Sequence, residues 1–275
     1  MRNALEHRAV AGGWPSHIYE FLLFGFKQAW ACLFGALMLA LLVATHLFYP
    51  RDLALPRYDF LTLAAVAIQL SLLRLRLETW EEAKVILAFH VAGTVMELFK
   101  TYWGSWIYPE ASTLRIAGVP LFSGFMYAAV GSYIARIWRI FDLRFSRYPP
   151  RWAPVALAAA IYVNFFAHHW LADMRIALLV LTALLFLHTR VHFRPFRKDR
   201  SMPLLLGFLL VALFIWFAEN IATFSNAWIY PHQRDGWTMV PATKLVAWYL
   251  LMIISFVLVA LVHRPQPIAD RAEAI

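Results

Sequence analysis

Long apolar runs, separated by short polar segments, dominate the hydropathy pattern of this chain. Eight of these runs are long enough, at about 18–25 residues each, to cross a hydrocarbon layer of about 30 Å as helices. They lack the period-two alternation that a lipid-facing β-strand requires. The pattern therefore predicts an all-α, polytopic bundle of about eight transmembrane helices at residues 29–49, 57–73, 84–103, 119–141, 152–170, 173–189, 203–224 and 238–262, preceded by a short interfacial helix at 16–26.

The composition agrees with a membrane location. Hydrophobic residues make up 62% of the chain and charged residues only 15%, whereas soluble domains are roughly half apolar and about a quarter charged. The 22 Phe, 12 Trp and 11 Tyr are typical of proteins that lie at bilayer interfaces. No segment is polar enough for a separate soluble domain, so residues 1–275 are predicted to form one integral membrane domain. The single Cys32 has no partner for an intramolecular disulfide.

The positive charge has a topological explanation. A formal net charge of +9 is compatible with nucleic-acid binding. However, the basic residues are concentrated in two loops, 136–151 and 190–200, and cytoplasmic loops of membrane proteins carry an excess of Lys and Arg. We therefore expect both loops and both termini to be cytoplasmic, and the partner to be the lipid bilayer and not a nucleic acid.

The tetrapeptide Trp-Ile-Tyr-Pro occurs twice, at 106–109 and 228–231, each time beginning nine residues after a glutamate, Glu97 or Glu219. An interface anchor with aromatic rings and a helix-ending proline would explain each tetrapeptide. It does not explain the matched glutamates. The repeat instead predicts two four-helix halves, 1–150 and 151–275, related by a pseudo-twofold axis along the membrane normal.

The two glutamates are the main candidates for chemistry. Ionisable residues within a span are costly and indicate a functional site, so Glu97 and Glu219 are candidate acid/base residues. Polar residues on the same helical faces or at the same depth are candidates for substrate binding: His90, Thr94, Thr101, Trp106, Tyr108, Asn164, His168, Thr223, Trp228, Tyr230 and Lys244. An ion pair between Glu219 and Lys244 is one interpretation, and such a pair would either hold the helices together or form part of a functional site.

The motif also suggests a hypothesis about the helix ends. The proline would end the helix, the tryptophan would anchor it at the interface, and the tyrosine hydroxyl would turn inward to a polar partner. Each glutamate would then face a shared pocket, and its replacement by Gln would leave stability nearly unchanged. The adjacent His168 and His169 are not expected to face the bundle together. No tight ligand spacing predicts a metal, and no motif predicts a cofactor.

The chain resembles the YoaT-like bacterial membrane proteins, domain-of-unknown-function family 817, in three stretches: GTVMELFKTYWGSWIYPE, RIAGVPLFSGFMYAAVGSYIAR and FAENIATFSNAWIYP. This resemblance implies a multi-pass protein of the bacterial inner membrane and implies no particular reaction. A more distant pattern is similar to heterodimer-type lycopene cyclases and carotenoid hydratases, at Glu97, Gly104, Trp106, Tyr108, Gly118, Val119 and Pro120. Those cyclases carry a carboxylate at the position that Phe122 occupies here.

Three functions are compatible with the sequence. The first is an enzyme that acts on a lipid or an isoprenoid or carotenoid-like substrate, with Glu97 or Glu219 as acid or base. The second is a small-solute or ion-coupled transporter with both glutamates along its route. The third is a non-catalytic structural or regulatory membrane protein, in which the repeat is architecture alone.

Overall fold

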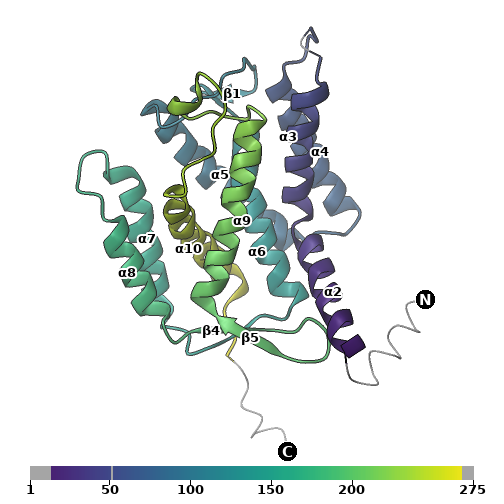
Figure 1. The fold of residues 1–275 in the computed structure, drawn as a ribbon, viewed down its shortest axis with the longest axis vertical. Helices are drawn as coiled ribbons and strands as arrows, with labels where there is room; N and C mark the ends of the chain where they lie inside the picture. The colour runs from purple at the N-terminus through teal and green to yellow at the C-terminus, as the bar shows by residue number, and fades with distance from the viewer. Residues whose placement is uncertain (1–13, 51, 268–275) are drawn as a thin grey trace, which may run out of the picture.

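The computed structural model describes residues 14–50 and 52–267, which form nine α-helices that run side by side in one bundle (Figure 1). The helices are α2 (Trp14–Ala31), α3 (Leu33–Phe48), α4 (Arg57–Arg74), α5 (Trp80–Tyr102), α6 (Phe122–Ile140), α7 (Trp152–Ala167), α8 (Arg175–Phe186), α9 (Leu204–Phe224) and α10 (Lys244–His263). A helix therefore overlaps each of the eight predicted runs, and α5 begins four residues before its run. Both extreme termini, whose location the sequence predicts, lie outside the described residues.

Helix α10 is the centre of the bundle. It packs against α5, α6, α7, α8 and α9, and most of its second half is buried (Figure 1). The most extensive helix pair is α5 with α6. Glycines allow this close approach: a Cβ atom at Gly93 would lie 2.6 Å from the ring of Tyr127, and one at Gly124 would lie 2.5 Å from the ring of His90. The α5–α6 pair is therefore held in a fixed register.

The two arginine-rich loops come together in a small sheet that the sequence did not predict. Strands β3 (Arg144–Ser146), β4 (Arg190–Phe193) and β5 (Arg200–Pro203) pair antiparallel in the order β3-β4-β5. Their apolar residues alternate inward, so that Phe145 and Val191 are buried opposite each other. Both basic loops therefore lie at the same end of the bundle, as the topology prediction requires. A second, two-stranded sheet of β1 (Arg115–Ile116) and β2 (Val119–Pro120) precedes α6.

The described helices have membrane character. By length and composition, α9 and α10 are able to cross a bilayer, and the α2–α3 pair, bent by 66° at its break, is a third if it counts as one span. Helices α7 and α8 are apolar but shorter, at 16 and 12 residues. Large apolar side chains face outward from α9, including Leu206, Leu209, Leu210, Phe214 and Phe217. Such a surface is expected against lipid and not against water.

The two Trp-Ile-Tyr-Pro segments contact each other directly. Ile107 and Ile229 form an antiparallel bridge in which each backbone N–H donates to the other's carbonyl oxygen at 3.0 Å. Equivalent residues of the two motifs are thus directly opposite, which makes the contact locally twofold. The ring of Trp106 meets the ring of Tyr230 edge to face at 6.2 Å between centroids. The turns that follow α5 and α9 therefore form one joint unit.

This bridge predicts a disulfide. In a pair that exchanges both backbone hydrogen bonds, the Cα atoms lie about 5.5 Å apart, which suits a disulfide. In a Cys32→Ser background, Ile107→Cys combined with Ile229→Cys should oxidise to an intramolecular disulfide, seen as a reducible shift in electrophoretic mobility. Each single cysteine variant is the control. Failure of the double variant to cross-link within folded protein would contradict the pairing.

Candidate functional site

Glu97 is buried near the end of α5 and is held by three aromatic donors. Its side chain is 5% exposed. Its Oε2 accepts hydrogen bonds from Trp106 Nε1 at 2.6 Å and from the Tyr108 hydroxyl at 2.5 Å, and its Oε1 accepts one from the Tyr127 hydroxyl at 2.7 Å. The first two donors come from the turn after α5, and the third comes from α6. The carboxylate therefore ties its own helix to the turn and to the next helix.

Glu219 has a matched arrangement in the second half. Its side chain is 3% exposed. Its Oε1 accepts from the Tyr230 hydroxyl, and its Oε2 accepts from Trp248 Nε1 at 2.6 Å. Tyr230 follows Glu219 by the same spacing as Tyr108 follows Glu97. The donors Tyr127 and Trp248 also correspond, since each lies seven residues after the proline that precedes its helix.

The tyrosines of the two turns act as neutral donors. Burial raises the pKa of Tyr108 well above its usual range, and the nearby Glu97 raises it further. Burial and Glu219 have the same effect on the pKa of Tyr230. Both hydroxyls consequently stay protonated at all physiological pH values. The expectation that each motif tyrosine turns inward to a polar partner agrees with these contacts.

Trp106 and Lys244 make contacts that the sequence did not indicate. Trp106 was expected to anchor the turn at the interface, but it is only 9% exposed and donates to Glu97 because that carboxylate needs a third partner. Lys244 was a candidate ion-pair partner of Glu219, but in the described part of the chain its ammonium has no carboxylate within 4 Å. It lies instead over the ring of Tyr230, at 4.3 Å from the centroid.

A second buried group lies beside the glutamates, around Lys100. This lysine, on α5, is 6% exposed. Its Nζ lies 3.1 Å from His168 Nε2 and 3.2 Å from His169 Nε2, and 4.5 Å from the ring centroid of Phe165. Both histidines thus face the bundle, contrary to the sequence-based expectation. The reason is that α7 ends at Ala167, so the helical spacing rule no longer separates adjacent side chains.

The cationic residues at this end outnumber their acidic neighbours. The charges of Lys244 and Arg175 act on Lys100, as does that of Asp173, and the charges of Glu219 and Arg175 act on Lys244. Asp173 is paired with Arg175 at 2.6 Å, and Glu219 is held by its aromatic donors. We call Lys100, His168, His169 and Lys244 the lysine–histidine site. Lys100 and His169 were missed by the sequence analysis, because a lysine near a helix end is usually a solvated residue.

The other predicted binding residues are dispersed. The Thr94 hydroxyl donates to the His90 carbonyl at 2.7 Å, and both side chains pack against Gly124 of α6. His90 Nδ1 and the Thr101 hydroxyl are buried without a hydrogen-bond partner among the described residues. Asn164 accepts from the Met174 N–H, and Thr223 accepts from Trp237 Nε1 at 3.1 Å. Trp228 packs in the apolar clusters around the two turns. His90 and Thr94 of α5 therefore pack against α6 and do not line an open pocket.

A cavity of about 570 Å³ opens beside the paired turns. Its lining includes His46, Pro109, Glu110, Ile229 and Trp237, but neither Glu97 nor Glu219. The expected shared pocket around the two glutamates is therefore not this cavity. Within the described residues, no group of three or more His, Cys, Asp or Glu side chains is arranged to hold a metal ion.

These features define a helical membrane protein with two glutamates held by aromatic donors and a cationic site beside them. The chain belongs to the family described as protein of unknown function DUF817, whose model matches residues 20–256. It is 46% identical over 243 residues to the uncharacterized protein YoaT of Bacillus subtilis strain 168, covering 88% of this chain and 91% of that protein. Among solved structures it is similar to MvINS, a mycobacterial Insig homologue from Mycobacterium vanbaalenii, with a TM-score of 0.46 and 14% identity over 69% of this chain and 98% of that chain. A cross-linked MvINS trimer gives the same values.

The contacts of Glu97 predict that its replacement lowers the stability of the protein. The sequence-based hypothesis expected stability to stay nearly unchanged. Glutamine offers one acceptor oxygen where three donors converge, so at least one buried donor loses its partner. Each such loss costs about 1–3 kcal/mol. Glu97→Gln should therefore lower the free energy of unfolding by about 2 kcal/mol or more, measured by thermal or denaturant unfolding in detergent. Glu81→Gln makes the same change at an exposed position of α5 and should have almost no effect. Equal stability of both variants would contradict the structural role.

Proposed function

We propose that this protein binds an anionic amphiphile, namely a lipid or isoprenoid that carries a phosphate or carboxylate, at the lysine–histidine site. The single observation that supports this proposal most is the burial of the Lys100 ammonium against two imidazoles, with no carboxylate of the described residues within 4 Å. Buried charges are normally paired, because burying an unpaired charge is expensive. An anionic head group supplies the missing partner.

The histidines suit this role. His168 Nδ1 lies 3.0 Å from the Asn164 carbonyl oxygen, which accepts and has no proton to give. The Nδ1 of His168 therefore carries the proton, and the Nε2 lone pair is free to accept from Lys100. Two ammonium protons are then used by the two imidazoles, and the third is left for a ligand. Lys244, beside the Tyr230 ring, supplies a second cation at the same end.

In this proposal, the glutamates form the framework of the site and do not act as acid or base. Each carboxylate already accepts hydrogen bonds from rigid aromatic donors on both oxygens. General acid–base catalysis requires a group within hydrogen-bond reach of the substrate proton, and these contacts occupy the positions that a substrate would need. Binding is therefore better supported than the enzymatic role that the glutamates suggested.

Anion transport is the second candidate. The observation that favours it is the position of two cationic side chains inside a helical bundle, since intramembrane charges of one sign commonly mark an ion pathway. Flux of inorganic phosphate or of chloride into liposomes containing the protein tests this candidate. Flux that is abolished by Lys100→Gln would favour transport over lipid binding.

We further propose that α4 to α8 cross the bacterial inner membrane together with α9, α10 and the α2–α3 pair. The β3–β5 end would be cytoplasmic and the lysine–histidine site would lie toward the outer face. The arginine-rich composition of the sheet supports this orientation.

An impermeant thiol reagent should label the variant Arg197→Cys only after the membrane is opened. Labelling of this variant in intact cells would show that the β3–β5 end faces outward and would contradict the proposed orientation.

Removing the lysines should weaken the binding of anionic amphiphiles. A charge-assisted hydrogen bond contributes about 1.5–3 kcal/mol, so Lys100→Gln and Lys244→Gln should each raise the dissociation constant for farnesyl phosphate by about tenfold or more. Farnesol, which lacks the phosphate, should bind the natural protein and both variants equally weakly. Lys84→Gln, at an exposed position of α5, is the matched control. An unchanged affinity in Lys100→Gln would refute the proposed site.

Binding should also strengthen at low pH. Burial, followed by the charges of Lys100 and His168, lowers the pKa of His169 below its ordinary 6.5, so its imidazole is neutral at neutral pH. A bound anion favours the protonated imidazole, so the affinity should rise as the pH falls toward the lowered pKa of His169. A sulfonated amphiphile is the suitable probe, because its own charge stays constant. His169→Gln should flatten the profile, and a profile that is equally steep in this variant would contradict the role of His169.

A further inference from the structure

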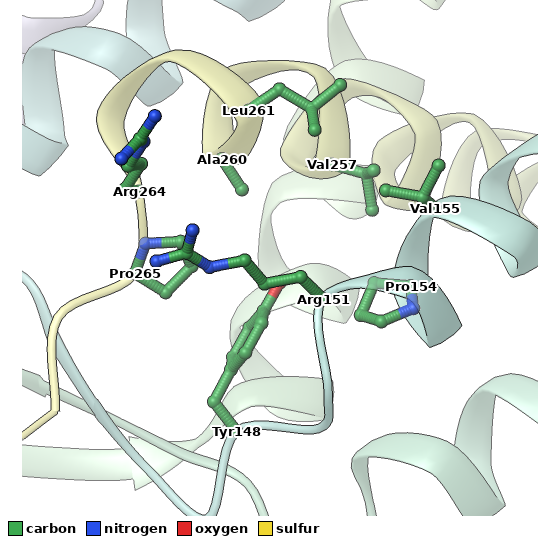
Figure 2. Close-up of a pocket in the computed structure, with 9 residues that line it drawn as sticks. All are labelled: Tyr148, Arg151, Pro154, Val155, Val257, Ala260, Leu261, Arg264 and Pro265. Carbon is green, nitrogen blue, oxygen red and sulfur yellow. The ribbon is translucent and has the colours of Figure 1, made fainter.

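A second cavity lies at the opposite end of the bundle, between the start of α7 and the end of α10 (Figure 2). Its volume is about 190 Å³. Its wall is largely apolar and is formed by Pro154, Val155, Val257, Ala260, Leu261 and Pro265. The cavity therefore suits a small group attached to an apolar chain.

Three polar side chains complete the lining. Arg151 reaches across the cavity toward Pro265, Arg264 lies above it at the end of α10, and the Tyr148 ring rises from below (Figure 2). Both arginines are exposed, and within the described residues neither guanidinium has a hydrogen bond or an ion pair. Burial raises the pKa of Tyr148 to about 12, so its hydroxyl remains a donor. The polar groups of the cavity are thus donors.

The position of the cavity agrees with a membrane-surface ligand. Phe145 of β3 donates its N–H to the Gln266 carbonyl oxygen at 3.0 Å, which places the end of α10 directly on the arginine-rich sheet. Arg264 has a left-handed backbone, with φ of 45°, and the chain turns there from α10 toward the sheet. Basic residues at such an end face the anionic head groups of the adjacent leaflet.

We propose that this cavity binds the phosphate of a membrane lipid, with Arg151 and Arg264 on the phosphate, the Tyr148 hydroxyl as a further donor, and the apolar wall against the glycerol and the first part of the acyl chains. Planar guanidinium groups bind phosphate oxygens through paired hydrogen bonds. The apolar wall favours a lipid over free phosphate, because free phosphate gains nothing from it. This site is independent of the lysine–histidine site.

The test compares full-length protein variants by native mass spectrometry in a neutral detergent. The probes are phosphatidic acid and a diacylglycerol with the same chains, which differ only in the phosphate. The natural protein should retain phosphatidic acid and lose diacylglycerol. The double variant Arg151→Gln/Arg264→Gln should bind phosphatidic acid at least about tenfold more weakly, as expected when two charged donors are lost.

The matched control is Arg147→Gln/Arg190→Gln, which removes two arginines from the same end but outside the cavity. It should keep the natural affinity for phosphatidic acid to within about twofold. An equal loss of affinity for phosphatidic acid in both double variants would show that the general positive charge of this end is responsible, and would overturn the site. Retention of diacylglycerol equal to that of phosphatidic acid would also overturn it. Inorganic phosphate that binds as tightly as phosphatidic acid would overturn the lipid assignment.

A second variant keeps all the charges and fills the space. Val155→Trp places a large ring against the apolar wall and should weaken phosphatidic acid binding while the arginines remain. If the arginine double variant unfolds, Val155→Trp still tests whether phosphatidic acid binds within the cavity. Natural affinity in folded Val155→Trp protein would contradict binding within the cavity.

Discussion

A carboxylate inside an apolar bundle must obtain all its hydrogen bonds from the protein, because hydrocarbon supplies none. This constraint acts at both Trp-Ile-Tyr-Pro motifs. Glu97 obtains its donors from the turn after its own helix and from the next helix, and Glu219 does the same. Each carboxylate thereby fixes the angle at which the chain leaves one helix and enters the next. Gly93, one turn before Glu97, leaves the space that Tyr127 needs.

The predictable parts of the fold are those with a local signal. Apolar runs predicted the helices. The repeated motif predicted that its tyrosine hydroxyl turns inward, and the hydroxyls of Tyr108 and Tyr230 donate to Glu97 and Glu219. The donors Tyr127 and Trp248 have no local signal, because their role depends on how the next helix packs. The β3–β5 sheet joins segments far apart in the chain, and no alternation within strands of three or four residues is long enough to indicate it.

The two turns meet through residues that the constraint has already positioned. Because both turns are held by their glutamates, Ile107 and Ile229 can pair through their backbones. Helix α4 secures the same region: Arg57 donates to the Ser225 carbonyl oxygen at 2.7 Å, and the Tyr58 hydroxyl donates to the Asn226 carbonyl oxygen at 3.0 Å. These carbonyls belong to the end of α9, where no intrahelical donor remains. The paired turns are therefore one rigid platform at this end of the bundle.

The residues that the two motifs share and the buried lysines are different residues. The glutamates, tyrosines and prolines occur in both motifs, whereas Lys100 corresponds to Ala222, and Lys244 corresponds to Ser123. A framework needs its carboxylates twice because each half has one helix-to-helix turn to hold. The lysines occur only once, and they have different neighbours: Lys244 lies over the ring of Tyr230, and Lys100 contacts His168 and His169. The asymmetric lysines, and not the symmetric glutamates, are consequently the residues whose burial the fold itself does not explain.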